Sequence, residues 1–148
     1  MASPDHQDVV TGYLQYAEAL SAGVPEESLA MRAAEEADAR VRRLIADGPA
    51  LEAWVTVRDI LRAAPDERLG VVAAGPLEDL VRLRGPEVVE AIEVEAARDE
   101  RFQWALGRIW LTVSELPPDI LARVVAASRA QINPLDEERT LRDHGFAT

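Results

Sequence analysis

The sequence predicts a single all-α domain of about seven to eight helices, arranged as a multi-helix bundle or as HEAT-like stacked helix pairs. Apolar residues recur at helical spacing through most of the chain. No segment alternates with the period of two that strands show, and no Asn-Gly or Asp-Gly turn separates two apolar runs. A length of 148 residues suits one domain with a sizeable core.

Helix start and stop signals divide the N-terminal third. Ser3-Pro4 is a favourable helix start, and acidic residues after Pro25 open a second helix that Asp47-Gly48-Pro49 ends. We expect these helices to form a hairpin over residues 1–48, packed on a core of residues 49–130.

The core is expected to begin with a helix from Ala50 to Ala63 and to contain two sharp corners. At Gly75-Pro76 one helix should stop and the next should start, because Pro is disfavoured inside helices and favoured at their first turn. Gly85-Pro86 predicts a second corner of the same kind. The inward side chains expected on the first of these helices are Leu51, Trp54, Val55 and Leu61.

Asp99 is expected to cap a helix from Arg101 to Val113. Apolar residues nearly encircle that segment, which predicts a central helix with neighbours on two sides. Pro117-Pro118 restarts the chain in a closing helix, and residues 131–148 are expected to form a polar C-terminal tail or a short helix.

Two tripeptides provide a faint internal repeat. Asp66-Glu67-Arg68 and Asp99-Glu100-Arg101 lie 33 residues apart, and each opens an apolar helix. The spacing fits stacked helix pairs. Acids are favoured at any helix start, so the two tripeptides can also occur by coincidence in an irregular bundle.

Composition excludes several classes of function. The net charge is −11, with 27 acids against 16 basic residues that are all Arg, which disfavours nucleic-acid binding and permits a basic protein partner. The absence of Cys excludes disulfides and thiol chemistry. The sequence shows no signal-peptide pattern and no apolar run of membrane-spanning length, so a cytoplasmic bacterial protein is expected.

Motifs for catalysis or cofactors are lacking. The two histidines, His6 and His144, are expected at the surface, away from other ligands. No phosphate-binding, nucleophile-elbow or calcium-loop motif occurs. We therefore expect no metal, no cofactor and no catalytic residue of these types.

Several features resemble a group of uncharacterised bacterial proteins that are classed as a domain of unknown function. The resemblance runs from about residue 9 to 125, and Ala-Gly-Pro-Leu-Glu-Asp-Leu at 74–80 is its most distinctive part. It implies a small helical domain and supplies no catalytic residues. The other matching features are Trp54, Ala64-Pro65-Asp66, Gly85, residues 95–99, Arg101-Phe102, Leu106 and Trp110.

Four acids are candidates for partner binding. Glu78 follows the first corner, where its position alone explains a helix-capping role, but it could also anchor a partner's Arg or act as a general base. Glu87, Glu90 and Glu93 share a helix face that is either a solvated surface or a docking ridge.

The three tryptophans are the large anchors in a chain with few aromatic residues. Trp54 and Trp110 fall on apolar stripes and are expected in the core, whereas Trp104 lies on a less regular face and is a candidate interface residue.

The leading hypothesis is a non-catalytic interaction module that binds a partner through an acidic or Trp-bearing face. An immunity-type protein is one concrete version. The alternatives are a carboxylate-based enzyme with a cleft near Glu78 and a structural homo-oligomer that buries Trp104.

Overall fold

The computed structural model describes residues 4–111 and 114–129 of the chain. Over those ranges the secondary structure is helical and contains no strand, which confirms the predicted all-α class. The elements are α1 (Pro4–Ser21), α2 (Leu29–Asp47), α3 (Ala50–Ala63), α4 (Asp66–Val72), the π-helical segment η1 (Ala73–Leu77), α5 (Glu78–Ala96), α6 (Glu100–Leu106) and α7 (Pro118–Ala127).

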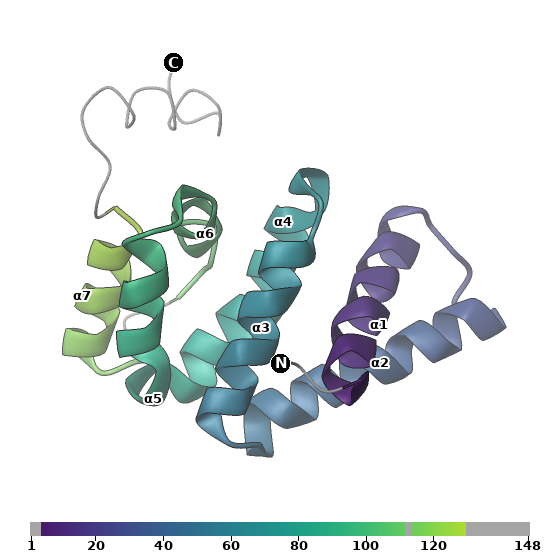
Figure 1. Ribbon diagram of the computed structural model, residues 1–148, viewed down its shortest axis with the longest axis horizontal. Helices are drawn as coiled ribbons and strands as arrows, with labels where there is room; N and C mark the ends of the chain where they lie inside the picture. The colour runs from purple at the N-terminus through teal and green to yellow at the C-terminus, as the bar shows by residue number, and fades with distance from the viewer. Residues whose placement is uncertain (1–3, 112–113, 130–148) are drawn as a thin grey trace.

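Helices α1 and α2 lie against each other at one end of the molecule (Figure 1). Helix α2 starts later than predicted, because Pro25 belongs to a turn in which its carbonyl accepts from the Ser28 amide. The Ser28 hydroxyl then caps the helix by accepting a 3.1 Å hydrogen bond from the Met31 amide.

Helix α3 has the predicted bounds, and of its predicted inward residues Trp54 and Leu61 are buried and Val55 packs against the core. Leu51 is 72% exposed, so its assignment to the core was wrong. The helix packs on α1 and α5, which fixes its rotation and leaves Leu51 outside the buried arc. The buried residues of α3 are Ala53, Trp54, Thr56, Val57, Ile60 and Leu61.

The corner predicted at Gly75-Pro76 does not exist. The chain stays helical from α4 through η1 into α5, with Pro76 buried inside the π-helical segment. The wider π turn accommodates a residue that lacks an amide hydrogen and would clash in a regular α-helix. Gly75 allows α1 to approach η1 closely, since a Cβ atom at this position would lie 3.2 Å from the Tyr13 hydroxyl of α1.

The second predicted corner, at Gly85-Pro86, is a kink within α5. Arg84 has non-helical angles (φ −129°, ψ 17°), and the helix resumes directly after it. Gly85 is buried against Leu116, with space too small for a side chain because an added Cβ would lie 2.7 Å from a Leu116 methyl.

Asp99 caps α6 as predicted, since its carboxylate accepts from the backbone amides of Arg101 (2.9 Å) and Phe102 (3.3 Å). The helix is much shorter than predicted and ends at Leu106, before Gly107. The predicted end at Val113 lies outside the described residues.

Helix α5, rather than the α6 segment, holds the central position, because it contacts α2, α3, α6 and α7. In a solenoid each repeat touches only its neighbours, so these contacts describe an irregular bundle instead of HEAT-like pairs. The predicted tail, residues 131–148, lies outside the described residues.

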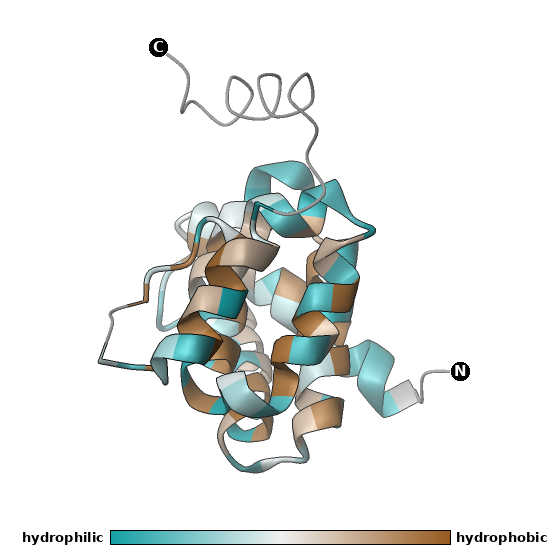
Figure 2. Ribbon diagram, turned by 90° about the vertical axis from the view of Figure 1, so that its left-hand side faces the viewer, coloured by the Kyte–Doolittle hydropathy of each residue, from teal (hydrophilic) through white to brown (hydrophobic). Residues whose placement is uncertain are grey.

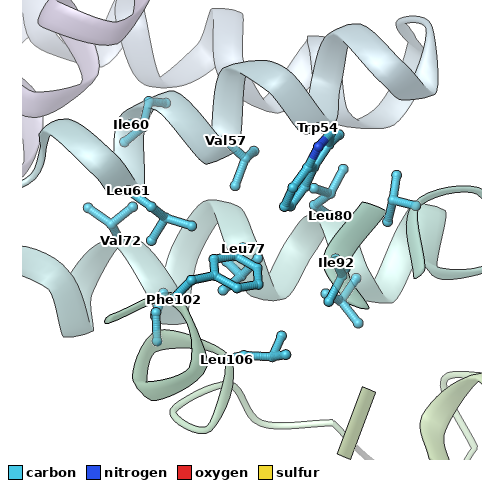
Figure 3. Packing of buried hydrophobic residues seen from close by; sticks show 14 of the residues in the cluster. Trp54, Val57, Ile60, Leu61, Val72, Leu77, Leu80, Ile92, Phe102 and Leu106 are labelled. Carbon is cyan, nitrogen blue, oxygen red and sulfur yellow. The ribbon is translucent and has the colours of Figure 1, made fainter. Parts of the chain in front are cut away.

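The core fills the space between α3, η1, α5 and α6 (Figure 3). Trp54 and Phe102 meet edge to face, with ring centroids 5.6 Å apart. The close-up also labels core side chains from these four elements and from α4, namely Val57, Ile60, Leu61, Val72, Leu77, Leu80, Ile92 and Leu106.

Candidate interaction surface around Trp110

Glu78 joins the start of α5 to the segment that follows α6. Its Oε1 accepts a 2.5 Å hydrogen bond from the Trp110 amide, and its Oε2 lies 3.6 Å from Arg82 Nη1. It does not cap a helix, because η1 runs straight into α5 and the Glu78 amide already donates to carbonyls of Ala73 and Gly75. The capping interpretation of this residue was therefore wrong.

The indole of Trp110 is 86% exposed, although the sequence predicted it in the core. The reason is the early end of α6. After Gly107 the backbone is no longer helical, and Ile109 and Leu111 pack against the core while Trp110 between them points outward. Side chains alternate sides in extended backbone, so taking Leu106-Gly107 as a helix end would have predicted this exposure.

Further charged side chains of α5 lie beside Glu78, which binds the Trp110 amide. Arg82 is bound to the Asp79 carboxylate and lies near Glu78, and both Arg82 and Asp79 are about one-third exposed. Trp and Arg are both residue types that are enriched at protein–protein hot spots.

The predicted ridge of Glu87, Glu90 and Glu93 is partly neutralised. Arg84 holds Glu87 with two hydrogen bonds of 3.0 and 2.7 Å, which lower the pKa of that carboxyl. The Arg123 guanidinium of α7 likewise binds Glu93 and lowers the pKa of its carboxyl. Glu90 is exposed and forms no ion pair with the described part of the chain.

Trp104 is half-buried against the core. Its ring lies next to Gly70 of α4, and the Arg108 guanidinium carbon lies 5.0 Å from the ring centroid. The side chain therefore helps to hold α6 on α4, and the most exposed tryptophan of the described residues is Trp110 instead.

A buried carboxylate that the sequence analysis did not single out is Glu95, whose side chain is 2% exposed. Arg62 of α3 donates to it from Nε (2.9 Å) and Nη2 (2.8 Å), and Arg98 donates from Nε (3.2 Å) and Nη2 (3.1 Å). Burial raises the pKa of Glu95, but the hydrogen bonds from both arginines outweigh it and lower the pKa. The sequence could have indicated the burial of Glu95, because this residue follows Ile92 by one turn on the inner face of α5.

The cavity beside Glu95 is too small for a substrate. Its volume of about 10 Å³ leaves room for about one water molecule. The oxygens of Glu95 are occupied by the two guanidinium groups, so this arrangement links α3 to the end of α5 and is not poised for proton transfer.

His6 is not the surface histidine that was expected. Its side chain is 15% exposed, and Nε2 lies 2.7 Å from Asp59 Oδ2, which ties α1 to α3. His144 lies outside the described residues. Across residues 4–111 and 114–129, no three His, Cys, Asp or Glu side chains gather as metal ligands would. Nor does any helix in those ranges have the length and apolar character needed to cross a membrane.

The sequence profile of a family of unknown function (DUF6869) matches residues 27–132. The match covers most of the chain, and the chain therefore belongs to this family. Helix α1 lies before the matched region, yet its Val10, Tyr13 and Ala17 are part of the same core. No curated protein and no solved structure matches the chain.

Proposed function

We propose that this member of the DUF6869 family is a non-catalytic protein of the bacterial cytoplasm that binds another protein through the surface around Trp110. The observation that carries the proposal is the 86% exposure of that indole. Trp is normally highly buried, and it is the residue most enriched at the energetic centres of protein interfaces.

The fixed backbone of Trp110 supports a binding role. Because the Glu78 carboxylate accepts from its amide and the side chains on either side pack inward, the backbone that carries the exposed indole is held at a defined position. An anchor that is already ordered loses little conformational entropy on binding. Arg82 and Asp79 supply polar groups for the edge of such an interface.

Charge suggests what kind of partner fits. The net charge of −11 favours a basic protein, whose approach it would accelerate at low ionic strength. Exposed Glu90 contributes to that field, whereas Glu87 and Glu93 are paired with arginines and contribute less. A basic toxin neutralised by this chain, as in an immunity pair, is one partner of this type.

The test is a tagged pull-down from the native host with three baits, read by quantitative mass spectrometry. The baits are the full-length wild type, Trp110→Ala and Leu29→Ala, the last being a matched control because Leu29 is 82% exposed on α2. We expect one basic protein to be enriched by the wild type and by Leu29→Ala and lost with Trp110→Ala.

Titration calorimetry with the purified partner gives the magnitude. Truncation of a hot-spot Trp costs about 2 kcal/mol or more, so Trp110→Ala should weaken binding by about 30-fold. If the wild type and Trp110→Ala bound the partner with equal affinity, the proposed surface would be overturned. If the pull-down enriched no protein at all, the proposed function would be overturned.

The carboxylate-enzyme alternative has less support. A general base needs an unoccupied oxygen, but Glu78 accepts from the Trp110 amide and faces Arg82 with its other oxygen. Among the described residues that line the small cavity at Glu95, Glu78 does not occur.

A further inference from the structure

Within the described part of the chain, a single hydrogen bond fixes the backbone at Trp110, and a side chain supplies it. Helices α5, α6 and α7 form one end of the molecule, which Figure 2 turns toward the viewer. Among the described residues, those numbered 109–111 take part in one hydrogen bond, from the Trp110 amide to Glu78 Oε1. No backbone carbonyl of the described ranges accepts from that amide. The order of this segment therefore depends on Glu78 for its polar contact.

The core places the two ends of this bond close together. Leu77 of η1 and Leu106, the last residue of α6, are buried in the same cluster, and η1 contacts α6 (Figure 3). The chain leaves the core just after each leucine, at Glu78 in one case and at Gly107 in the other. Glu78 stays 18% exposed, so its carboxylate lies at the edge of the core, where it meets the Trp110 amide.

The π turn of η1 sets the rotation of Glu78 about the helix axis. The Glu78 amide donates to the carbonyl of Ala73, five residues earlier, which is a π-helical bond. Such a turn contains one residue more than an α turn, so it shifts the following residues by one position, or about 100°, around the axis. The string Ala-Gly-Pro-Leu-Glu-Asp-Leu at 74–80 thus contains both the turn and the carboxylate that the turn directs.

Arg82 orients the second oxygen of Glu78. Its Nη1 lies 3.6 Å from Glu78 Oε2, and its Nη2 is bound to the carboxylate of Asp79. Because the guanidinium attracts Oε2, the other oxygen is left for the Trp110 amide. A hydrogen bond from a backbone amide to an ionised carboxylate is stronger than one to a neutral acceptor.

We propose that Glu78 is a positioning residue for partner binding, which acts by ordering the backbone of Trp110 in the free protein and not by touching the partner. This inference rests on the proposed function of the Trp110 surface. A segment that is already ordered loses less conformational entropy when the complex forms, so loss of the Glu78 carboxylate should weaken binding even though the indole is still present.

The first test needs no partner and follows hydrogen exchange of the Trp110 amide by NMR in the full-length protein. Glu78→Ala removes the acceptor and should speed that exchange by about 10-fold or more. Glu78→Gln keeps an acceptor oxygen and should have a smaller effect. Glu90→Ala is the control of equal charge change on the same helix and should leave the rate unchanged. The amide of Val57, buried in α3, reports whether the fold is intact.

The second test is a double-mutant cycle with the protein that the pull-down enriches, measured by titration calorimetry. Glu78→Ala should weaken binding of that protein by up to about 10-fold in the wild-type background and should have no effect in the Trp110→Ala background, since Glu78 acts through Trp110. An equal loss in both backgrounds would mean that Glu78 contacts the partner directly, and the positioning role would be overturned.

The two tests separate a failure of this inference from a failure of the proposed function. A Trp110 amide that exchanges at the wild-type rate in Glu78→Ala would overturn the positioning role, whatever the partner does. If Trp110→Ala bound the partner as tightly as the wild type, the proposed surface would fail, whereas the exchange of the Trp110 amide would still respond to Glu78→Ala.

Discussion

The guanidinium of Arg84 donates a 2.7 Å hydrogen bond from Nη1 to the backbone carbonyl of Gly48, and so ties the kink of α5 to the end of α2. The same nitrogen donates to the Ile45 carbonyl (3.2 Å). Arg101 binds the C-terminal end of α3 in the same way, because its guanidinium donates to the backbone carbonyls of Leu61 and Ala64. Two arginines thus satisfy helix C-terminal carbonyls from a distant part of the chain.

The first prediction concerns Arg84. We expect Arg84→Ala to lower the midpoint of urea unfolding, because the carbonyls at the end of α2 lose a charged donor. Glu87→Gln is the matched control, since it removes only the ion pair and keeps the bonds to Gly48 and Ile45. It should lower the midpoint less, and an equal effect of the two substitutions would contradict the capping role.

The second prediction concerns the buried carboxylate of Glu95. We expect Glu95→Ala to lower the free energy of unfolding by about 1–3 kcal/mol, because Arg62 and Arg98 lose an acceptor that both approach closely. The lower part of the range applies, since these guanidinium groups are 45% and 62% exposed and water can partly replace the acceptor. Urea denaturation near neutral pH measures the difference.

Glu95 also predicts a pH dependence. Its pKa in the folded protein is lowered below the ordinary 4.5, so the unfolded chain takes up the proton first as the pH falls. Its stabilising contribution is therefore complete above about pH 4.5 to 5 and is lost as the pH falls through the lowered folded pKa. The stability difference between wild type and Glu95→Gln should shrink in that acidic range, and a constant difference would contradict the assignment.

Substitution of Trp54 and of Trp110 should differ strongly in its effect on stability. Trp54→Ala should cost about 3–5 kcal/mol, because it leaves a cavity beside Phe102 in the core. Trp110→Ala should change the free energy of unfolding by no more than about 0.5 kcal/mol, since the removed ring is exposed. Iodide should quench the fluorescence that disappears with Trp110→Ala and should barely quench that of Trp54.

The contact between α1 and α2 gives a further prediction. A Cβ atom at Gly12 would lie 2.9 Å from the Cβ of Ala37, and neither atom can rotate away. Gly12→Ala should therefore destabilise the protein by about 1 kcal/mol, the overpacking cost exceeding the gain in helix propensity. Adding Ala37→Gly should relieve the clash, and additive effects of the two substitutions in thermal unfolding would contradict the close approach.

Local sequence signals determined the all-α class and many of the helix boundaries. Helices α3 and α7 begin after Pro49 and Pro117, and α6 begins after the Asp99 cap, because these residues act through their own backbone or an immediate neighbour. The Gly48 end of α2 was predictable for the same reason.

Tertiary structure decided the features that depend on distant contacts. Gly75-Pro76 has the sequence of a corner, but burial of Pro76 and the close approach of Tyr13 keep the chain helical there. Glu78 looked like a cap and instead accepts from Trp110, 32 residues later. The exposure of Trp110 follows from where α6 ends and which neighbours reach the core, and local periodicity carries no information about contacts at that separation.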